Sequence, residues 1–404
     1  MSGIPSLQAH EMLQTSGLQE VFSAIAKAGG EARIVGGAVR NGLLGEPVQD
    51  IDIATDLLPE QVVAAAKRAH LKAVPTGIDH GTVTIVSHNR GFEVTTLRHD
   101  VETDGRRATV AYTDDWAADA ARRDFTLNAL YCDRHGKVHD PLGGYADLKS
   151  RNIRFVGDPV ARITEDYLRI LRFFRFFAQY GDGPADKDAL AACSRLRDGL
   201  KQLSRERIGQ EMRKLLMAKR AVCAVRLMNQ TGVGMALFST DVDADSLECV
   251  VAIDAAHELA PDYALRLAAC LPLEANVLGG LLRLPKAEER AIAAMRDCMP
   301  PAPGLRDNER KVVLYRTGAD TWRRVVRLDW ARSDADANDA EWHGLLRLPD
   351  EWAIPTLPVT GADIMAAGVP AGPNVGETLR ALEDWWMAGG FVATREELLG
   401  RVST

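Results

Sequence analysis

The chain has 404 residues, of which 46% are hydrophobic and 26% are charged, so it is long enough to form more than one hydrophobic core. The six cysteines form no Cys-x-x-Cys pair, and no stretch approaches the roughly 18 apolar residues of a membrane span or follows a signal-peptide pattern. These features argue against a zinc site, a disulfide framework and membrane contact, and we expect a cytoplasmic protein; the net charge of −7 argues weakly against an indiscriminate nucleic-acid binder.

Residues 34–56, IVGGAVRNGLLGEPVQDIDIATD, combine a glycine turn with two carboxylates. Gly36 and Gly37 separate a short expected strand from a helix over residues 38–44, whose N-terminus and Arg40 favour phosphate binding. A second strand over residues 51–54 places Asp50 and Asp52 at alternate positions, and therefore on one face. Adjacent carboxylates repel each other, and a divalent cation is the usual remedy.

The next stretches predict a mixed sheet of about five strands in total. Residues 81–87 and 91–97 alternate β-branched residues with others and are joined by three residues, which is typical of a β-hairpin. Glu93 is a candidate third carboxylate if its strand lies beside Asp50 and Asp52. It is an ordinary exposed glutamate if the strand lies elsewhere, and the spacing alone does not decide between these alternatives.

Residues 98–116 are polar and charged, and they predict a mobile or substrate-facing loop. The segment ARRDFTLNALYCD, residues 121–133, follows, with Arg122, Arg123 and Asp124 before an apolar run. Adjacent arginines are more often a solvated face than a phosphate site, so on its own the pair leaves both interpretations open.

Residues 165–180, EDYLRILRFFRFFAQY, predict one uninterrupted amphipathic helix with a polar row of Asp166, Arg169, Arg172 and Arg175. The alternative to a functional role is a solvated basic face, but all the cations in the row are arginine, which suits phosphates and planar bases. Residues 151–220 hold sixteen Lys and Arg against nine Asp and Glu, a local excess of +7. This segregation favours a polyanionic partner.

The remainder of the chain predicts helices without obvious chemistry. Six of the seven tryptophans follow residue 320, and we expect them to be mainly core residues rather than nucleotide-stacking ones. The resulting division is a head over residues 1–150, a helical neck over 151–220, a helical body over 221–300 and a helical tail over 301–404.

Three motifs in order, GGAVR with an Asp-x-Asp about ten residues on, ARRDFTLNALYCD and EDYLRILRFFRF, resemble the class II nucleotidyltransferases. This family comprises the bacterial and mitochondrial tRNA CCA-adding enzymes and bacterial poly(A) polymerases. The resemblance covers roughly residues 30–215, and residues 360–386 are similar to the tail of CCA-adding members. It implies an α+β fold: a polymerase-beta-like head with a mixed sheet and helices, followed by an all-helical neck, body and tail.

The resemblance also implies roles for individual residues. Asp50 and Asp52 would hold two Mg²⁺ ions, and Glu93 lies where members place a further catalytic acid. Asn41 departs from an aspartate common in the family, which leaves the metal pair unaffected. The residues that would bind the nucleotide are Gly37, Arg40, Arg123, Asp166, Arg169, Arg172 and Arg175.

The expected reaction is template-independent addition of C, C and A to the 3′ end of tRNA from CTP and ATP, by a monomer or homodimer. Cytosine and adenine both present an amine donor beside a ring-nitrogen acceptor, so Asp166 can accept from the amine while Arg169 donates to the ring. Uracil and guanine would leave both contacts unpaired. The alternatives are a poly(A) polymerase, an enzyme that adds only CC or only A, and a non-catalytic RNA-binding protein; the intact pair of aspartates argues against the last.

Overall fold

The computed structural model describes residues 3–104, 107–299 and 302–402, and it divides the chain into two compact units, Met1–Val242 and Asp243–Thr404. The predicted boundaries near residues 150, 220 and 300 are finer than this division and stay predictions.

The first unit opens with a mixed sheet. In chain order its strands are β1 Ala32–Val35, β2 Asp52–Thr55, β3 Lys72–Gly77, β4 Thr82–Ser87, β5 Arg90–Thr96, β8 Tyr131–Cys132 and β9 Val138–His139. They lie in the order β3-β4-β5-β2-β1-β8-β9, and among the pairs of these strands only β2–β5 is parallel. The sheet is wider than the expected five strands because β3 contains a proline and β8 has two residues, so neither shows an alternating pattern.

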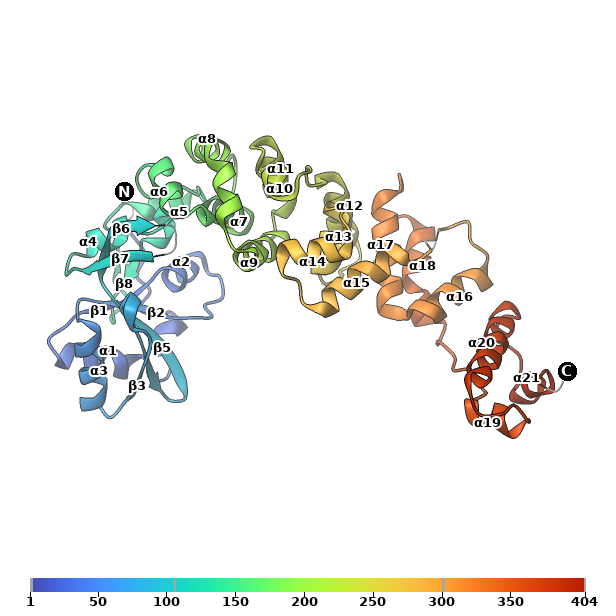
Figure 1. The fold of residues 1–404 in the computed structure, drawn as a ribbon. Helices are drawn as coiled ribbons and strands as arrows, with labels where there is room; N and C mark the ends of the chain where they lie inside the picture. The colour runs from blue at the N-terminus through green and yellow to red at the C-terminus, as the bar shows by residue number, and fades with distance from the viewer. Residues whose placement is uncertain (1–2, 105–106, 300–301, 403–404) are drawn as a thin grey trace. The chain divides into compact units, whose positions relative to one another are not determined.

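Helices cover one face of this sheet, and the opposite face is only partly accessible, because Val35 and Ala54 on it are buried in a cluster with Ala120. Helices α1 (Leu18–Lys27) and α3 (Pro59–Arg68) contact each other and the strands, burying an apolar face that includes Phe22 and Val62 (Figure 1). On β5, Phe92 and Val94 are buried while Glu93 between them is exposed. Because side chains alternate along a strand, Glu93 projects from the face opposite to these buried residues.

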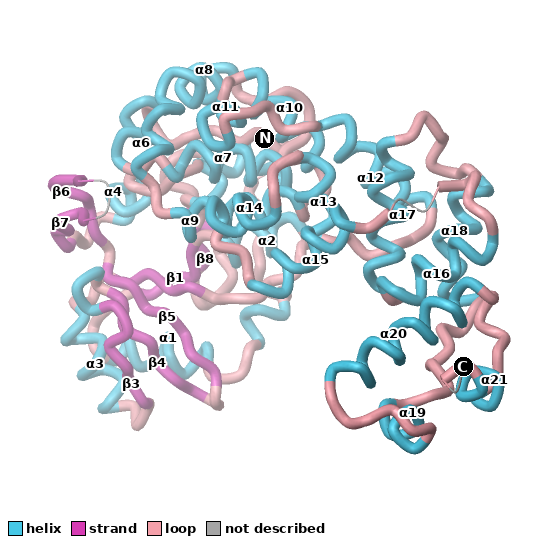
Figure 2. The backbone as a smooth tube through the Cα atoms, turned by 45° about the vertical axis from the view of Figure 1, so that its right-hand side comes forward, coloured by secondary structure: helices cyan, strands magenta, loops and turns pink. Residues whose placement is uncertain are grey.

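The prediction of a loop over residues 98–116 is wrong, because most of this segment forms a β-hairpin. Strands β6 (Arg98–Asp104) and β7 (Arg107–Tyr112) pair antiparallel as a separate two-stranded sheet, which Figure 2 shows apart from the larger one. Backbone pairing does not require apolar side chains, and a polar strand pair gives little hydrophobic signal. Residues 105–106 lie outside the described part of the chain.

The prediction of one continuous helix over residues 165–180 is also wrong, because the structure has two helices there. Helix α6 (Pro159–Glu165) ends before Asp166, whose backbone is extended at φ −157° and ψ 105°, and α7 (Leu168–Tyr180) begins two residues later. The Asp166 side chain accepts a hydrogen bond from the Leu168 N–H at 3.1 Å. An aspartate that satisfies a free N–H of the following turn starts a new helix, and this competes with continuing the old one.

The other helical segments of this unit are short, and α7 packs against α9 and α10 among them. A cluster of phenylalanine rings joins α7 to the segment after α4, with Phe125 and Phe176 centroids 4.9 Å apart. The remaining segments, including 3₁₀ turns labelled η, are η1 Glu11–Gln14, α2 Gly37–Leu44, η2 Ile78–His80, α4 Trp116–Ala121, η3 Thr126–Asn128, α5 Gly144–Lys149, α8 Lys187–Leu196, η4 Arg197–Gln202, α9 Arg205–Leu216, α10 Ala221–Gln230 and α11 Val233–Phe238.

The second unit is helical throughout the residues that the structure describes. Of the six tryptophans predicted to be core residues, Trp322, Trp330, Trp342 and Trp386 are buried, whereas Trp352 and Trp385 are half-buried. Its helices are α12 Ala244–Ala256, α13 Tyr263–Cys270, α14 Ala275–Leu282, α15 Lys286–Asp297, α16 Asp307–Thr317, α17 Ala319–Arg332, α18 Ala340–Glu351, α19 Gly361–Ala366, α20 Pro373–Ala388 and α21 Arg395–Gly400.

Within the described ranges, no single helix is long and apolar enough to cross a membrane. Helices α13 and α14 would pass that test only as a pair, and the chain bends by 109° between them.

Candidate active site

The three candidate carboxylates come together at the centre of the sheet. Strands β2 and β5 pair in parallel with Asp52 opposite Glu93, and Asp50 lies just before β2. All three residues are exposed and line one cavity of about 280 Å³ together with Ile51, Arg90 and Gly91. The condition on which a role for Glu93 depended, that its strand should lie beside the aspartates, is therefore met.

The electrostatics of this cavity suit a bound cation. Partial desolvation, followed by the charges of Glu93 and Asp50, raises the pKa of Asp52, while the Arg123 guanidinium opposes this shift. Among the described residues, no group of three or more His, Cys, Asp or Glu side chains is placed to hold a metal ion by itself. Mg²⁺ is usually held by one or two carboxylates with substrate phosphates and water rather than by a complete protein cage, so the donors present fit that ion.

The glycine turn lies next to Arg123. Gly36 has φ +70° and precedes α2, of which Gly37 is the first residue. A Cβ on Gly36 would lie 3.7 Å from Nη1 of Arg123, so the turn and the guanidinium are neighbours. Because Arg123 also lowers the pKa of Asp52, this one cation lies within electrostatic reach of both the turn and Asp52.

Asp119 holds the two adjacent arginines, a role that was not predicted from the sequence. This aspartate on α4 is 1% exposed and accepts hydrogen bonds from Arg122 Nε at 2.8 Å, Arg123 Nη2 at 2.9 Å and the Tyr131 hydroxyl at 2.7 Å. Burial alone would raise the pKa of Asp119, but the two arginines and the hydroxyl lower it. Arg122 and Arg123 are therefore not a solvated face, and the spacing of three and four residues from Asp119 was the available signal.

Arg40 is directed into the protein. It is 7% exposed and donates to Asn128 Oδ1 at 2.5 Å, to the Tyr180 hydroxyl at 2.8 Å and to Asn41 Oδ1 at 2.9 Å. These contacts join α2 to η3 and to the end of α7. Its predicted contact with the triphosphate stays a prediction, although Nη2 lies 3.6 Å from where a Cβ on Gly37 would be.

The predicted polar row consists of Asp166, just before α7, and three arginines on α7, and each member has a protein partner. Asp166 is paired with Arg207, and Arg169 with Glu165 and the carbonyl oxygen of Arg162. The two later members face buried or half-buried carboxylates: Arg172 donates to Asp124, through Nε at 2.8 Å and also through Nη2, and Arg175 donates to Glu211.

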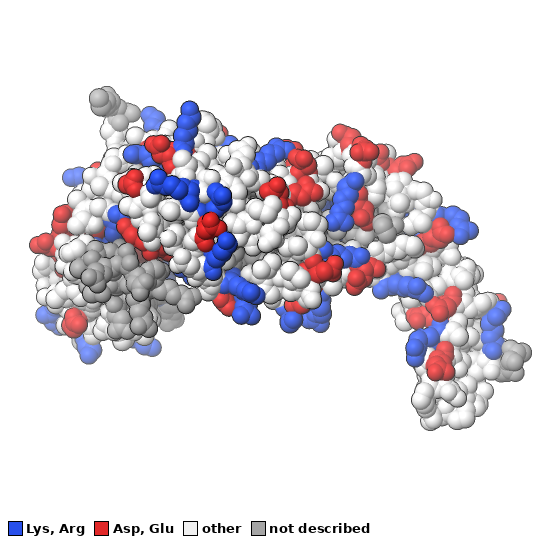
Figure 3. Space-filling model, turned by 45° about the horizontal axis from the view of Figure 1, so that its top comes forward, with Lys and Arg blue, Asp and Glu red and all other residues white. Residues whose placement is uncertain are grey.

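These pairs show which members of the row are accessible. Arg175 is 7% exposed and Glu211 5%, so their ion pair is part of the interior. The side chain of Asp166 is 25% exposed and that of Arg172 is 32% exposed. Asp124 and Glu211 were not predicted as partners, although Asp124 lies inside a recognised motif. On the face drawn in Figure 3, Lys and Arg side chains are interspersed with Asp and Glu.

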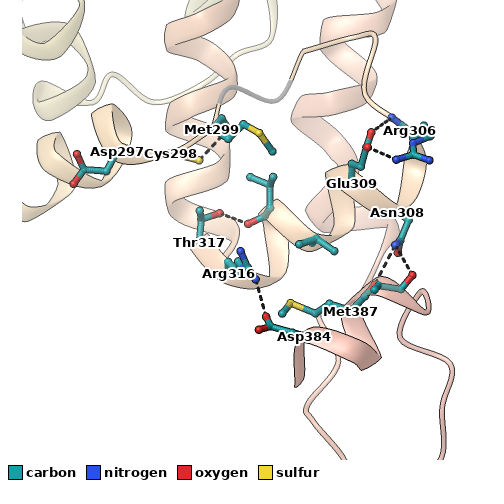
Figure 4. A pocket seen from close by; sticks show the side chains of 13 residues that line it. Asp297, Cys298, Met299, Arg306, Asn308, Glu309, Arg316, Thr317, Asp384 and Met387 are labelled. Atoms are coloured by element: carbon teal, nitrogen blue, oxygen red, sulfur yellow. Dashed lines mark hydrogen bonds and ion pairs between the residues drawn. The ribbon is translucent and has the colours of Figure 1, made fainter. Parts of the chain in front are cut away.

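A second cavity, of about 1050 Å³, lies in the second unit and contains none of the predicted site residues. Its walls come from α16, α20 and the end of α15, with an ion pair between Arg316 and Asp384 at 2.9 Å (Figure 4). It therefore adds nothing to the chemistry of the carboxylate cluster.

Comparison with known proteins identifies the family. Residues 32–154 match the model of the poly A polymerase head domain, and residues 185–240 match a probable RNA- and SrmB-binding site of polymerase A. The mitochondrial CCA tRNA nucleotidyltransferase 1 of Mus musculus is 34% identical over 97% of this chain and 91% of its own length. The chain belongs to the family of CCA-adding tRNA nucleotidyltransferases.

Further relatives agree with this assignment. The CCA-adding enzyme of Levilactobacillus brevis is 33% identical over 95% of this chain and 96% of its own length. The crystal structure of the Bacillus stearothermophilus CCA-adding enzyme in complex with CTP superimposes with a TM-score of 0.78 at 30% identity, covering 100% of this chain and 97% of that one. The predicted family, enzyme class and fold class are confirmed, whereas the roles of individual site residues stay predictions.

Proposed function

We propose that this enzyme adds C, C and A to the 3′ end of tRNA, using CTP and ATP and no nucleic-acid template. Its relatives are nucleotidyltransferases matched over nearly their whole length. The observation that carries the proposal is the parallel pairing of β2 with β5, which sets Asp52 opposite Glu93 beside the glycine turn. Nucleotidyl transfer requires carboxylates of this kind next to a site for a triphosphate.

Asp50 and Asp52 would hold Mg²⁺, with Glu93 as a further acid beside them. The ion would neutralise charge on the transferring phosphoryl group. Gly37 contributes a free backbone N–H at the start of α2, which favours an anion there. Arg123, fixed by Asp119 and Tyr131, supplies a cation near both the turn and the carboxylates. Its ordered guanidinium suits a triphosphate oxygen.

Asp166 and Arg169 would read the base. Asp166 accepts hydrogen bonds and Arg169 donates them, a combination that matches cytosine and adenine but leaves uracil and guanine unpaired. Arg172 and Arg175 support this pair, because their bonds to Asp124 and Glu211 fix α7 to the ARRDFT segment and to α9. The proteins of known structure that share this fold include complexes with CTP and with tRNA, which agrees with these substrates. The cytoplasmic location and the monomeric or homodimeric state remain expectations.

The test supplies a tRNA that lacks its last three nucleotides with each labelled triphosphate separately and with CTP and ATP together. We expect products that end in CCA and stop there when their 3′ ends are sequenced. A long A tract without C would instead identify a poly(A) polymerase, and incorporation of UTP would contradict the proposed base selection.

A substitution separates catalysis from RNA binding. We expect Asp52→Asn to lower kcat by at least about 100-fold, because one acceptor of the cation site is lost. Glu60→Gln is the matched control: it removes an exposed carboxylate from α3, on the covered face of the sheet, and should leave kcat unchanged. If the two variants were equally active, Asp52 would not be a catalytic residue.

A further inference from the structure

Helix α9 presents two charges to the polar row of α7. Arg207 and Glu211 are four residues apart and therefore lie on one face of α9, which packs against α7. Arg207 pairs with Asp166 near the beginning of α7, while Glu211 pairs with Arg175 and lies 3.9 Å from Arg172. In each of these two pairs the charge on α9 is opposite to the charge it meets, so α9 holds the polar row at both its beginning and its end.

The carboxylate of Asp166 is held through both of its oxygens. Oδ1 accepts from the Leu168 N–H at 3.1 Å, and Oδ2 accepts from Arg207 Nη2 at 2.6 Å. The backbone bond comes from the residue's own turn, whereas Arg207 reaches it from a helix about forty residues later. Arg207 therefore restrains the rotation of this carboxylate from outside its own turn.

We propose that Arg207 is a positioning residue that sets nucleotide specificity by fixing the Asp166 carboxylate. This inference rests on the proposed role of Asp166 in reading the base. A carboxylate discriminates between an amine and a carbonyl on a base only while its acceptor oxygen is held at the base edge. Without Arg207, Oδ2 loses its charged donor, and the carboxylate can turn to water or to another cation.

The competing interpretation is that Arg207 contacts an RNA phosphate. Its side chain is 32% exposed, and it belongs to the basic segment of residues 151–220. A phosphate contact would change the affinity for tRNA equally for every triphosphate. A positioning role would change the ratio between triphosphates, so the two interpretations make different kinetic predictions.

The experiment measures kcat/KM for CTP and for UTP on a tRNA that lacks its last three nucleotides, together with the KM for tRNA. The variants are Arg207→Ala, Arg207→Lys and the matched control Lys214→Ala, which removes an exposed charge from the same helix. We expect Arg207→Ala to lower the CTP-over-UTP ratio by about 10-fold or more, as expected for the loss of a hydrogen bond to a charged group. Arg207→Lys should give an intermediate ratio, because lysine keeps the charge without the planar fork.

Lys214→Ala should keep the ratio of the wild type, whatever its effect on the KM for tRNA. A wild-type ratio in Arg207→Ala, or a change confined to the KM for tRNA, overturns the proposal. If Arg207→Ala does not fold by circular dichroism, a wild-type ratio in Arg207→Lys overturns it instead. If the wild-type enzyme adds neither C nor A, the proposed function itself is wrong. This outcome is seen with the wild type alone, before any variant is compared.

Discussion

The buried pair of Arg175 and Glu211 should be a main determinant of the stability of the α7–α9 contact. Arg175 is 7% exposed and Glu211 is 5% exposed. Burial lowers the pKa of Arg175 even though Glu211 opposes this effect, so the cation is strongly desolvated. Glu211→Met removes its hydrogen-bonded counter-charge and leaves only the weaker effect of Asp124. Loss of one partner of a buried pair typically costs about 3–5 kcal/mol.

The lower end of this range applies here. Nη1 of Arg175 keeps its bond to Gln179 at 2.9 Å, and the guanidinium lies 4.2 Å from the centroid of the Phe176 ring. We therefore expect Glu211→Met to lower the free energy of local opening of α7 and α9 by about 3 kcal/mol. Native-state hydrogen exchange of peptides from these helices measures this quantity directly. Tryptophan fluorescence would not, because six of the seven tryptophans lie in the second unit.

A double-mutant cycle tests the reasoning. The double variant Glu211→Met with Arg175→Met should return to within about 1 kcal/mol of the wild type, since apolar residues often replace a buried ion pair without loss. Gln210→Met, an exposed change on the same helix, is the control. A loss below about 1 kcal/mol in Glu211→Met would mean that the pair behaves as a surface salt bridge and would refute the argument.

Two further predictions concern the glycine turn and the C-terminal helices. Gly36→Ala should lower kcat/KM for CTP and cost about 1–3 kcal/mol of stability, because φ +70° disfavours a side chain. Gly42→Ala, inside the helix that follows the turn, is the control, and equal effects of the two changes in thermal melts and kinetics would contradict the prediction. The hydrogen bond from Arg395, followed by those from Thr360, lowers the pKa of Asp363 from 3.8 to about 2. The ionised Asp363 therefore stabilises the folded state at pH values above its pKa in the unfolded chain, and this stabilisation is lost as pH falls toward 2. Asp363→Asn should accordingly lower the Tm of the second unit at about pH 6 by more than at about pH 3. If Asp363→Asn lowered the Tm equally at the two pH values, the ion pair with Arg395 would not be the source of this stability.

The catalytic motif could be predicted from the sequence because its geometry is local. The turn at Gly36 depends on neighbouring residues and is present in the structure. The strand begins one residue later than predicted, at Asp52, but Asp50 just before it still lines the same cavity. The position of Glu93 could not be decided, because which non-consecutive strands pair is a tertiary property. The structure resolves it through the parallel pairing of β2 and β5.

The polar row of α7 shows why the remainder was not predictable. A helical wheel gives the direction of each side chain but not what lies opposite, so nothing indicated that Glu211 would cover Arg175. The break at Asp166 involves a side-chain bond to the Leu168 N–H, which competes with an otherwise strong helical pattern. Arg40 likewise resembles a phosphate ligand by position, yet it bonds to Asn128 and Tyr180.

The contacts of α7 divide its polar row into two kinds of residue. Arg172 and Arg175 are bound to Asp124 and Glu211 and tie α7 to its surroundings, so their arginine identity is explained by these ion pairs without any nucleotide. Asp166 and Arg169 lie at the beginning of the row, where the helix break leaves the Asp166 carboxylate 25% exposed and Arg169 is 14% exposed. Under the proposed mechanism, Asp166 and Arg169 meet the nucleotide and the other two arginines keep them in place, because a site that selects bases without a template must keep its hydrogen-bond pattern fixed between substrates.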